Sequence, residues 1–298
     1  MLIAAGAVSL AAPAVAHAYD WPLKPFDRPH PIRGAFDDPR EHEGVTGSYR
    51  SFHFGVDICA PDGTPVYAVE GGTLYRYKDA VAVRQGPGHE FAYWHVETSL
   101  PEHSLVTKGE EIGRIRPGWG HVHFAERVDG VYVNPLRPGG LEPFTDTTTP
   151  VVAAIDLTDD GVPVDRGHVT GDIDLVADAY DVPPLAPPPP WQDARWTPAL
   201  VRWRITRDDK DVIEWETAAD FRTTLLQPDQ YDLVYAPGTR QDHPGIPGDF
   251  RFWLSQDFDT TLLPNGTYRL EVDASDTRGN TGRAFVDFTV ANREGGRA

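Results

Sequence analysis

Cysteine and methionine are scarce in this chain, and positive charge is outnumbered by negative charge. Among 298 residues there are one Cys and one Met, and 27 Lys and Arg against 45 Asp and Glu give a net charge of −18 at pH 7. A single cysteine cannot close a disulfide within the chain, so stability must come from hydrophobic cores or a bound metal. The negative balance argues against a nucleic-acid partner and against electrostatic attachment to an anionic membrane, since both need a basic surface.

Two common hydrolase signatures are also missing. Neither His42-Glu43 nor His89-Glu90 is followed by a second histidine at the spacing of the H-E-x-x-H zinc-protease helix. The chain has no G-x-S-x-G sequence, which disfavours a serine hydrolase.

The first 18 residues form an apolar, alanine-rich run that ends in Ala16-His17-Ala18. This small-residue pattern, followed by polar Tyr19-Asp20, predicts a secretory signal peptide cleaved after Ala18, although no Lys or Arg precedes the apolar run. The run is shorter than the ~20 residues that span a bilayer. We therefore expect a secreted or cell-envelope protein with no membrane span in its mature form.

The rest of the chain divides into two parts, residues 19–146 and 147–298. The first contains short β runs between Gly and Pro residues, such as Phe91-Ala-Tyr-Trp-His-Val, and predicts an antiparallel sheet or barrel. In the second, segments such as Thr267–Ala274 alternate with period two. This pattern predicts a β-sandwich, and the segment resembles bacterial immunoglobulin-like modules. The expected fold is all-β: an antiparallel-sheet domain followed by an immunoglobulin-like β-sandwich.

Two irregular stretches lie in the second part. The proline-rich residues 183–190 are interpreted as a loop between strands, and residues 217–249 form an insertion with no predicted structure. Asp276–Asn280 is interpreted as a hairpin turn rather than a calcium loop.

Histidines carry the functional signal. His121 and His123, two residues apart on a strand, can point into one cavity. His53 and Asp57 can share an ion only if the chain bends between them, and Gly55 tolerates the dihedral angles that such a bend needs. Two His and one Asp make a three-ligand zinc set whose fourth position is open to water. The lone Cys59 is interpreted as a small buried residue rather than a ligand.

These motifs are similar to those of the lysostaphin-like, or LytM-type, zinc endopeptidases. The run His53-Phe-Gly-Val-Asp-Ile-Cys-Ala-Pro-Asp-Gly-Thr-Pro-Val resembles the family's H-x-G-x-D segment. Tyr93-Trp-His95 resembles its Y-x-H, His121-Val-His123 its H-x-H, and Val133-Asn134-Pro135 its closing V-N-P. The resemblance covers roughly residues 33–137, with the motifs in the family's order.

The resemblance implies one Zn²⁺ ion held by His53, Asp57 and His123. It implies that His95 and His121 are the catalytic pair, and that the substrate is a peptidoglycan peptide. Two other functions stay open, a catalytically silent relative that binds the wall or a partner, and a secreted peptidase that acts on proteins. For residues 147–298 we expect a wall or protein partner.

The sequence departs from the family at two places. The loop before His121 is short and carries Trp119 with Arg114 and Arg116; we expect local packing for the tryptophan and solvated charges for the arginines. Ala125 shifts Glu126 by one position from the family's glutamate, so no role is assigned to Glu126.

Overall fold

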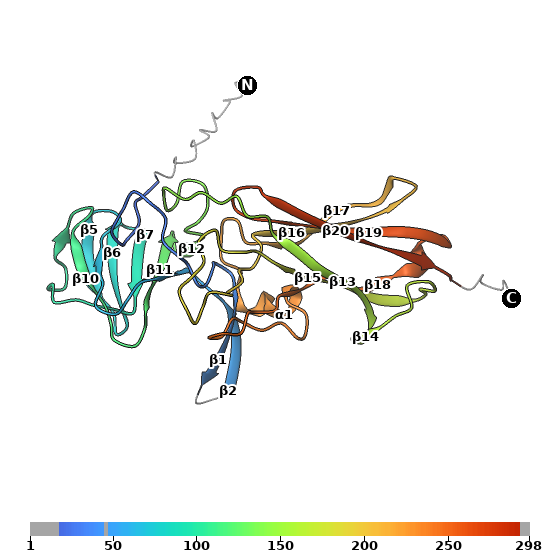
Figure 1. The fold of residues 1–298 in the computed structure, drawn as a ribbon, viewed down its shortest axis with the longest axis horizontal. Coiled ribbons are helices and arrows are strands. Elements are labelled where there is room, and N and C mark those ends of the chain that lie inside the picture. The colour runs from blue at the N-terminus through green and yellow to red at the C-terminus, as the bar shows by residue number, and fades with distance from the viewer. Residues whose placement is uncertain (1–17, 45–46, 293–298) are drawn as a thin grey trace, which may run out of the picture.

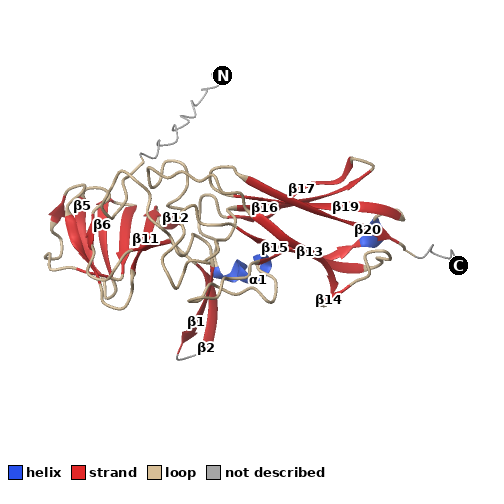
Figure 2. Cartoon of the chain, in the orientation of Figure 1, coloured by secondary structure: helices blue, strands red, loops and turns tan. Residues whose placement is uncertain are grey.

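The computed structural model describes residues 18–44 and 47–292, so residues 1–17 of the predicted signal peptide lie outside the described residues. Strands dominate this part of the chain, and the all-β prediction is confirmed (Figure 2). The helical segments described are α1 (Tyr231–Val234) and two 3-10 turns, η1 (Pro228–Gln230) and η2 (Thr260–Leu262).

The first part of the chain builds two antiparallel sheets around one core. A seven-stranded sheet has the order β12-β11-β7-β6-β5-β9, with β3 paired to β11, and a three-stranded sheet has the order β4-β10-β8. Strand β6 reads Ala-Val-Ala-Val and is buried on both faces, as a run of small and β-branched residues favours. The strands are β3 (Val56–Cys59), β4 (Pro65–Tyr67), β5 (Gly72–Arg76), β6 (Ala80–Gly86), β7 (His89–Trp94), β8 (Val96–Glu97), β9 (Leu105–Val106), β10 (Glu111–Ile115), β11 (His121–Val128) and β12 (Val131–Val133).

The second part is a pair of four-stranded antiparallel sheets with a core between them. One sheet has the order β14-β13-β15-β18 and the other β17-β16-β19-β20. This is a β-sandwich, and its assignment to the immunoglobulin-like class stays a prediction. The strands are β13 (Val151–Asp159), β14 (Val162–Pro163), β15 (Asp172–Tyr180), β16 (Leu200–Arg207), β17 (Lys210–Asp220), β18 (Arg251–Asp259), β19 (Gly266–Ser275) and β20 (Thr281–Val290).

The two parts lie end to end in an elongated molecule, and the hairpin of β1 (Pro39–Gly44) and β2 (Gly47–Phe52) projects from their junction (Figure 1). At this junction each core includes an aromatic residue from the other part of the chain. Phe52, at the end of β2, belongs to the core of the sandwich, and Trp196, from the loop between β15 and β16, belongs to the core of the first part. The proline-rich stretch lies in that same loop, as predicted.

Candidate active site

Three side chains from distant parts of the sequence converge on one point: His53, Asp57 and His123. Nε2 of His53 lies 2.7 Å from Nδ1 of His123, and Oδ1 of Asp57 lies 3.2 Å from the first nitrogen and 3.0 Å from the second. All three residues are buried. The structure thus brings the three predicted metal ligands together.

Strand pairing places two of these ligands side by side. Asp57 on β3 lies directly opposite His123 on β11 in the antiparallel register. Residues directly opposite each other in such a pair present their side chains on the same face. His121 lies two positions before His123 and faces the same side, as its spacing predicts.

Backbone hydrogen bonds fix the third ligand, His53, between β2 and β3. Its N–H donates to the carbonyl of Asp38 at 2.9 Å, and its own carbonyl accepts from the N–H of Asp37 at 2.8 Å. Nδ1 of the ring lies 2.7 Å from the carbonyl oxygen of Ala35. Because a carbonyl oxygen only accepts, Nδ1 carries the ring proton, and the lone pair on Nε2 faces Asp57 and His123.

Gly55 is required for a different reason from the one expected. Its φ lies outside the left-handed region, so no unusual dihedral angle demands glycine. A Cβ atom at this position would clash with the carbonyl oxygen of Phe124 and would lie 2.9 Å from Nε2 of His123. The prediction that Gly55 is needed for its backbone dihedral angles is therefore wrong. Glycine is needed here because it permits the close approach of β11.

The predicted catalytic pair borders the same point. Nδ1 of His121 lies 2.7 Å from the carbonyl oxygen of Trp119 and donates to it, which leaves Nε2 free to accept, 3.5 Å from Oδ1 of Asp57. His95 has a φ of 65°, and its ring stacks on Trp119 with centroids 3.5 Å apart. The rings of His95 and His121 lie 4.7 Å apart, and Nδ1 of His95 is buried without a hydrogen-bond partner.

Burial keeps these imidazoles neutral. It lowers the pKa of His53 to about 3, with the positive charge of Arg40 adding to the effect. Burial, followed by the charge of His121, lowers the pKa of His95 to about 3, and burial also lowers the pKa of His121. At neutral pH His53, His95 and His121 are therefore uncharged, the form needed to bind a metal or accept a proton.

Two arginines that sequence reasoning missed line the site. Nη2 of Arg40 lies 3.3 Å from Oδ2 of Asp57, and Nη2 of Arg33 lies 3.3 Å from Nε2 of His121. The guanidinium of Arg33 also lies over the ring of Trp191, 4.4 Å from its centroid, so the proline-rich loop of the sandwich reaches this site. The cavity that these residues border has a volume of about 390 Å³. No local motif marks either arginine, because their position depends on the path of residues 33–40.

The loop before His121 behaves partly as expected. Trp119 packs locally, but against the ring of His95, so it forms a wall of the site. Arg114 pairs with Glu111 at 2.8 Å and Arg116 with Asp79 at 3.0 Å. Neither arginine lines the cavity.

Glu126 has a structural role that the sequence did not reveal. It is buried and accepts hydrogen bonds from Tyr19 at 2.7 Å and from the two terminal nitrogens of Arg137 at 2.6 and 3.0 Å. Nε2 of His89 lies 2.9 Å from Oε1 of Glu126. This network joins the start of the described chain to β11, away from the metal ligands.

Comparison with known proteins agrees with this geometry. Residues 51–135 match the family model described as Peptidase family M23. A DD-carboxypeptidase/endopeptidase, Mpg, of Neisseria meningitidis is 34% identical over 94 residues, which are 28% of this chain and 22% of that protein. An uncharacterized metalloprotease of Haemophilus influenzae is 35% identical over 124 residues, which are 38% of this chain and 26% of that protein.

Two solved structures are also similar. A zinc-containing peptidase from Vibrio cholerae is 21% identical, with 41% of this chain and 40% of that chain covered and a TM-score of 0.34. Csd3 of Helicobacter pylori is 25% identical, with 41% and 34% covered and a TM-score of 0.33.

The matched segment, residues 51–135, contains His53, Asp57 and His123. Residues 51–135 of this chain are similar to the M23, or LytM-type, peptidase family. The chain spans only about a quarter of the length of the curated relatives that it matches.

The donor set fits the zinc that this family implies. Two imidazole nitrogens and one carboxylate oxygen are ligand types that zinc uses at a catalytic site. Two of the three also have an outer partner that orients them: the carbonyl of Ala35 for His53, and Arg40 for the second oxygen of Asp57. Separately, none of the helices in the described segments has the length and apolar character of a transmembrane span.

Proposed function

We propose that this chain is a zinc-dependent endopeptidase that hydrolyses amide bonds in peptidoglycan peptides in the cell envelope or outside the cell. The observation that carries the proposal is the convergence of His53 Nε2, Asp57 Oδ1 and His123 Nδ1 on one point, with His95 and His121 beside it. The complete ligand set favours an active enzyme over a silent relative.

Different residues of the site suit metal binding and proton transfer, according to where they lie. His53, Asp57 and His123 would hold zinc, which when bound supplies Lewis-acid polarisation of a carbonyl and lowers the pKa of water. Nε2 of His121 carries the lone pair, because Nδ1 donates to the carbonyl of Trp119, and the guanidinium of Arg33 lies 3.3 Å from that nitrogen. His121 is therefore placed to accept a proton from an attacking water and to return it to the leaving amine.

His95 is held differently and suits a different task. Its ring stacks on Trp119, and its centroid lies 4.7 Å from that of the His121 ring. A neutral ring with one nitrogen protonated can donate a hydrogen bond to the oxygen of a tetrahedral intermediate. Arg33 adds a positive charge beside His121 and favours substrates that carry a carboxylate near the cleaved bond.

The test is digestion of purified cell wall, with the released peptides separated and sequenced. The wild-type chain should create new amine ends. His123→Ala should lose both bound zinc and activity, whereas His121→Ala should keep zinc and lose activity. His103→Ala, at an exposed histidine outside the cavity, is the matched control and should change neither.

Each alternative function has its own outcome. Binding to the wall with no new amine ends would favour a silent relative, and cleavage of a protein panel but not of the wall would favour a general peptidase. A wall or protein partner for residues 147–298 stays a prediction, tested by sedimentation of the full chain with purified wall.

A further inference from the structure

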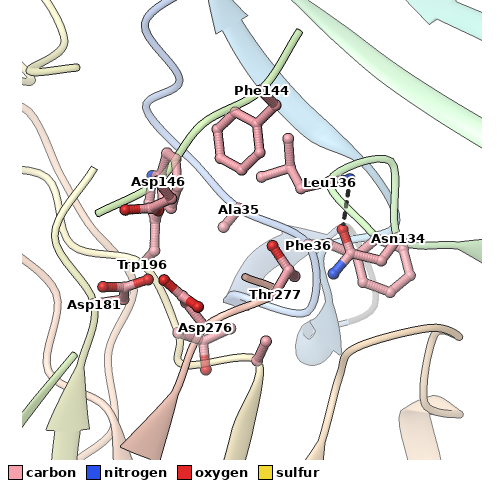
Figure 3. Close-up of a pocket in the computed structure, with 12 residues that line it drawn as sticks. Ala35, Phe36, Asn134, Leu136, Phe144, Asp146, Asp181, Trp196, Asp276 and Thr277 are labelled. Carbon is pink, nitrogen blue, oxygen red and sulfur yellow. Dashed lines mark hydrogen bonds between the residues drawn. The ribbon is translucent and has the colours of Figure 1, made fainter. Parts of the chain in front are cut away.

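We propose that Asp146, Asp181 and Asp276 form a second cation site, which binds a hard divalent ion such as Ca²⁺ at the junction of the two domains. Asp146 lies in the segment between β12 and β13, Asp181 directly follows β15, and Asp276 directly follows β19. One carboxylate oxygen from each lies within 4.8 Å of the others, and the three side chains turn toward one another (Figure 3). We call these three residues the junction cluster.

The junction cluster is buried, and its charges are not balanced by a base. Its three residues are between 3% and 8% exposed, and no Lys, Arg or His in residues 18–44 and 47–292 forms an ion pair with them. Arg278 lies nearby, but its guanidinium pairs with Glu142 at 3.1 Å and donates to the carbonyls of Phe144 and Leu136. Buried carboxylates in contact repel one another unless a proton or a cation intervenes.

Asp181 gives an independent sign of a missing ligand. It is 3% exposed, and its one hydrogen bond in the described chain is from the N–H of Val182 to Oδ1 at 2.8 Å. Oδ2 has no donor there. Burial, together with the charge of Asp146, raises the pKa of Asp181 to about 8, which shows how poorly the protein alone supports its charge.

A small cavity lies where these oxygens meet. Its volume is about 20 Å³, and the three aspartates line it together with Trp196 and Thr277. A space of this size holds a single water or ion. The chemistry of the walls favours a cation, because the three acidic groups present only acceptor oxygens.

The donor atoms select the kind of ion. All three ligands are carboxylate oxygens, whereas zinc sites use nitrogen or sulfur as well. Ca²⁺ accepts six to eight oxygens in flexible geometry, and carboxylates can bind it with one or both oxygens. The junction cluster is therefore distinct in chemistry from the His-Asp-His site.

An ion here would tie the two domains together. The turn at Asp276–Asn280, which forms the predicted hairpin between β19 and β20, already reaches the first domain through Arg278, and Nδ2 of Asn280 donates to the carbonyl of Asp146 at 2.9 Å. Asp181 begins the loop that carries Trp196 into the core of the first domain. Cation binding would hold this loop and the segment between β12 and β13 at the same point.

The experiment is a calcium titration of the full chain, dialysed free of Ca²⁺ and supplied with one equivalent of Zn²⁺ so that the peptidase site is filled. Isothermal titration calorimetry should show one further site, and Ca²⁺ should raise the Tm. Asp181→Asn keeps the shape of the side chain but should weaken Ca²⁺ binding at least ~10-fold, because it removes a ligand rather than an outer partner. Asp229→Asn, at an exposed aspartate of η1, is the control and should bind as wild type.

The sign of the stability change separates a cation site from an ordinary structural role. Without Ca²⁺, Asp181→Asn should melt at or above the wild-type Tm, because it relieves repulsion in the junction cluster; with Ca²⁺ it should melt below wild type. If Asp181→Asn fails to fold, Asp146→Asn repeats the test. Wild-type protein that neither binds Ca²⁺ nor changes Tm, or variants that bind it with unchanged affinity, would overturn the proposal.

Discussion

Phe52 links the sandwich to the metal site, and replacing it by alanine should weaken both. The residue directly precedes His53, yet its ring lies in the core of the second domain, with centroids 5.4 Å from Tyr231 and 5.8 Å from Tyr235. It is 3% exposed. Removing a phenyl ring so well buried costs about 3–5 kcal/mol of unfolding free energy.

The same substitution should reduce zinc affinity, because the backbone of His53 loses the anchor beside it. Loss of an outer support of a metal ligand typically costs about 10–100-fold in affinity, so we expect a drop in that range. Competition with a chromophoric chelator measures this affinity, and urea unfolding measures stability.

Phe288→Ala is the matched control. Phe288 is 1% exposed and stacks on Tyr268 within the sandwich core, with centroids 5.7 Å apart. It should lose similar stability and keep the zinc affinity of wild type. Equal zinc affinities for Phe52→Ala and Phe288→Ala would refute the idea that the sandwich supports His53.

Three further outcomes follow from contacts at the junction and the core. Tyr235→Phe should lower the free energy of unfolding by about 1 kcal/mol, because the hydroxyl of Tyr235 donates a buried hydrogen bond to a carbonyl. Tyr231→Phe should not lower it, because the hydroxyl of Tyr231 is buried without a hydrogen-bond partner, so equal losses in urea unfolding would contradict this reasoning. Arg137→Met should cost about 3–5 kcal/mol by leaving the buried carboxylate of Glu126 without its arginine, and adding Glu126→Gln should recover part of it. A double variant no more stable than the single would argue against the pair. Arg33→Met should raise KM for peptides with a free carboxylate more than for their amidated forms, and an equal change in both would remove the proposed preference.

Much of the fold could be predicted because its signals are local. Period-two alternation marks β19, and Gly and Pro residues punctuate the short strands of the first domain. The spacing of His121 and His123 was sufficient to place both on one face. The grouping of these histidines with His53 and Asp57 came from the family resemblance, because spacing alone does not show which distant segments meet.

The remainder depends on tertiary contacts that leave no local pattern. Nothing near Phe52 indicates that its ring belongs to the other domain, and the insertion at residues 217–249 had no predicted structure although Tyr231 and Tyr235 from it enclose that ring. The neighbours of Arg33 follow from the path of two loops. The close approach that requires Gly55 likewise depends on β11, which is about seventy residues further along the chain.

The most direct measurement is anomalous diffraction at the zinc absorption edge from crystals of the full chain grown with zinc. One strong peak bounded by His53 Nε2, Asp57 Oδ1 and His123 Nδ1 is the predicted result. Absence of a peak there, in crystals whose protein has bound zinc elsewhere, would contradict the assignment of these three residues and with it the proposed chemistry.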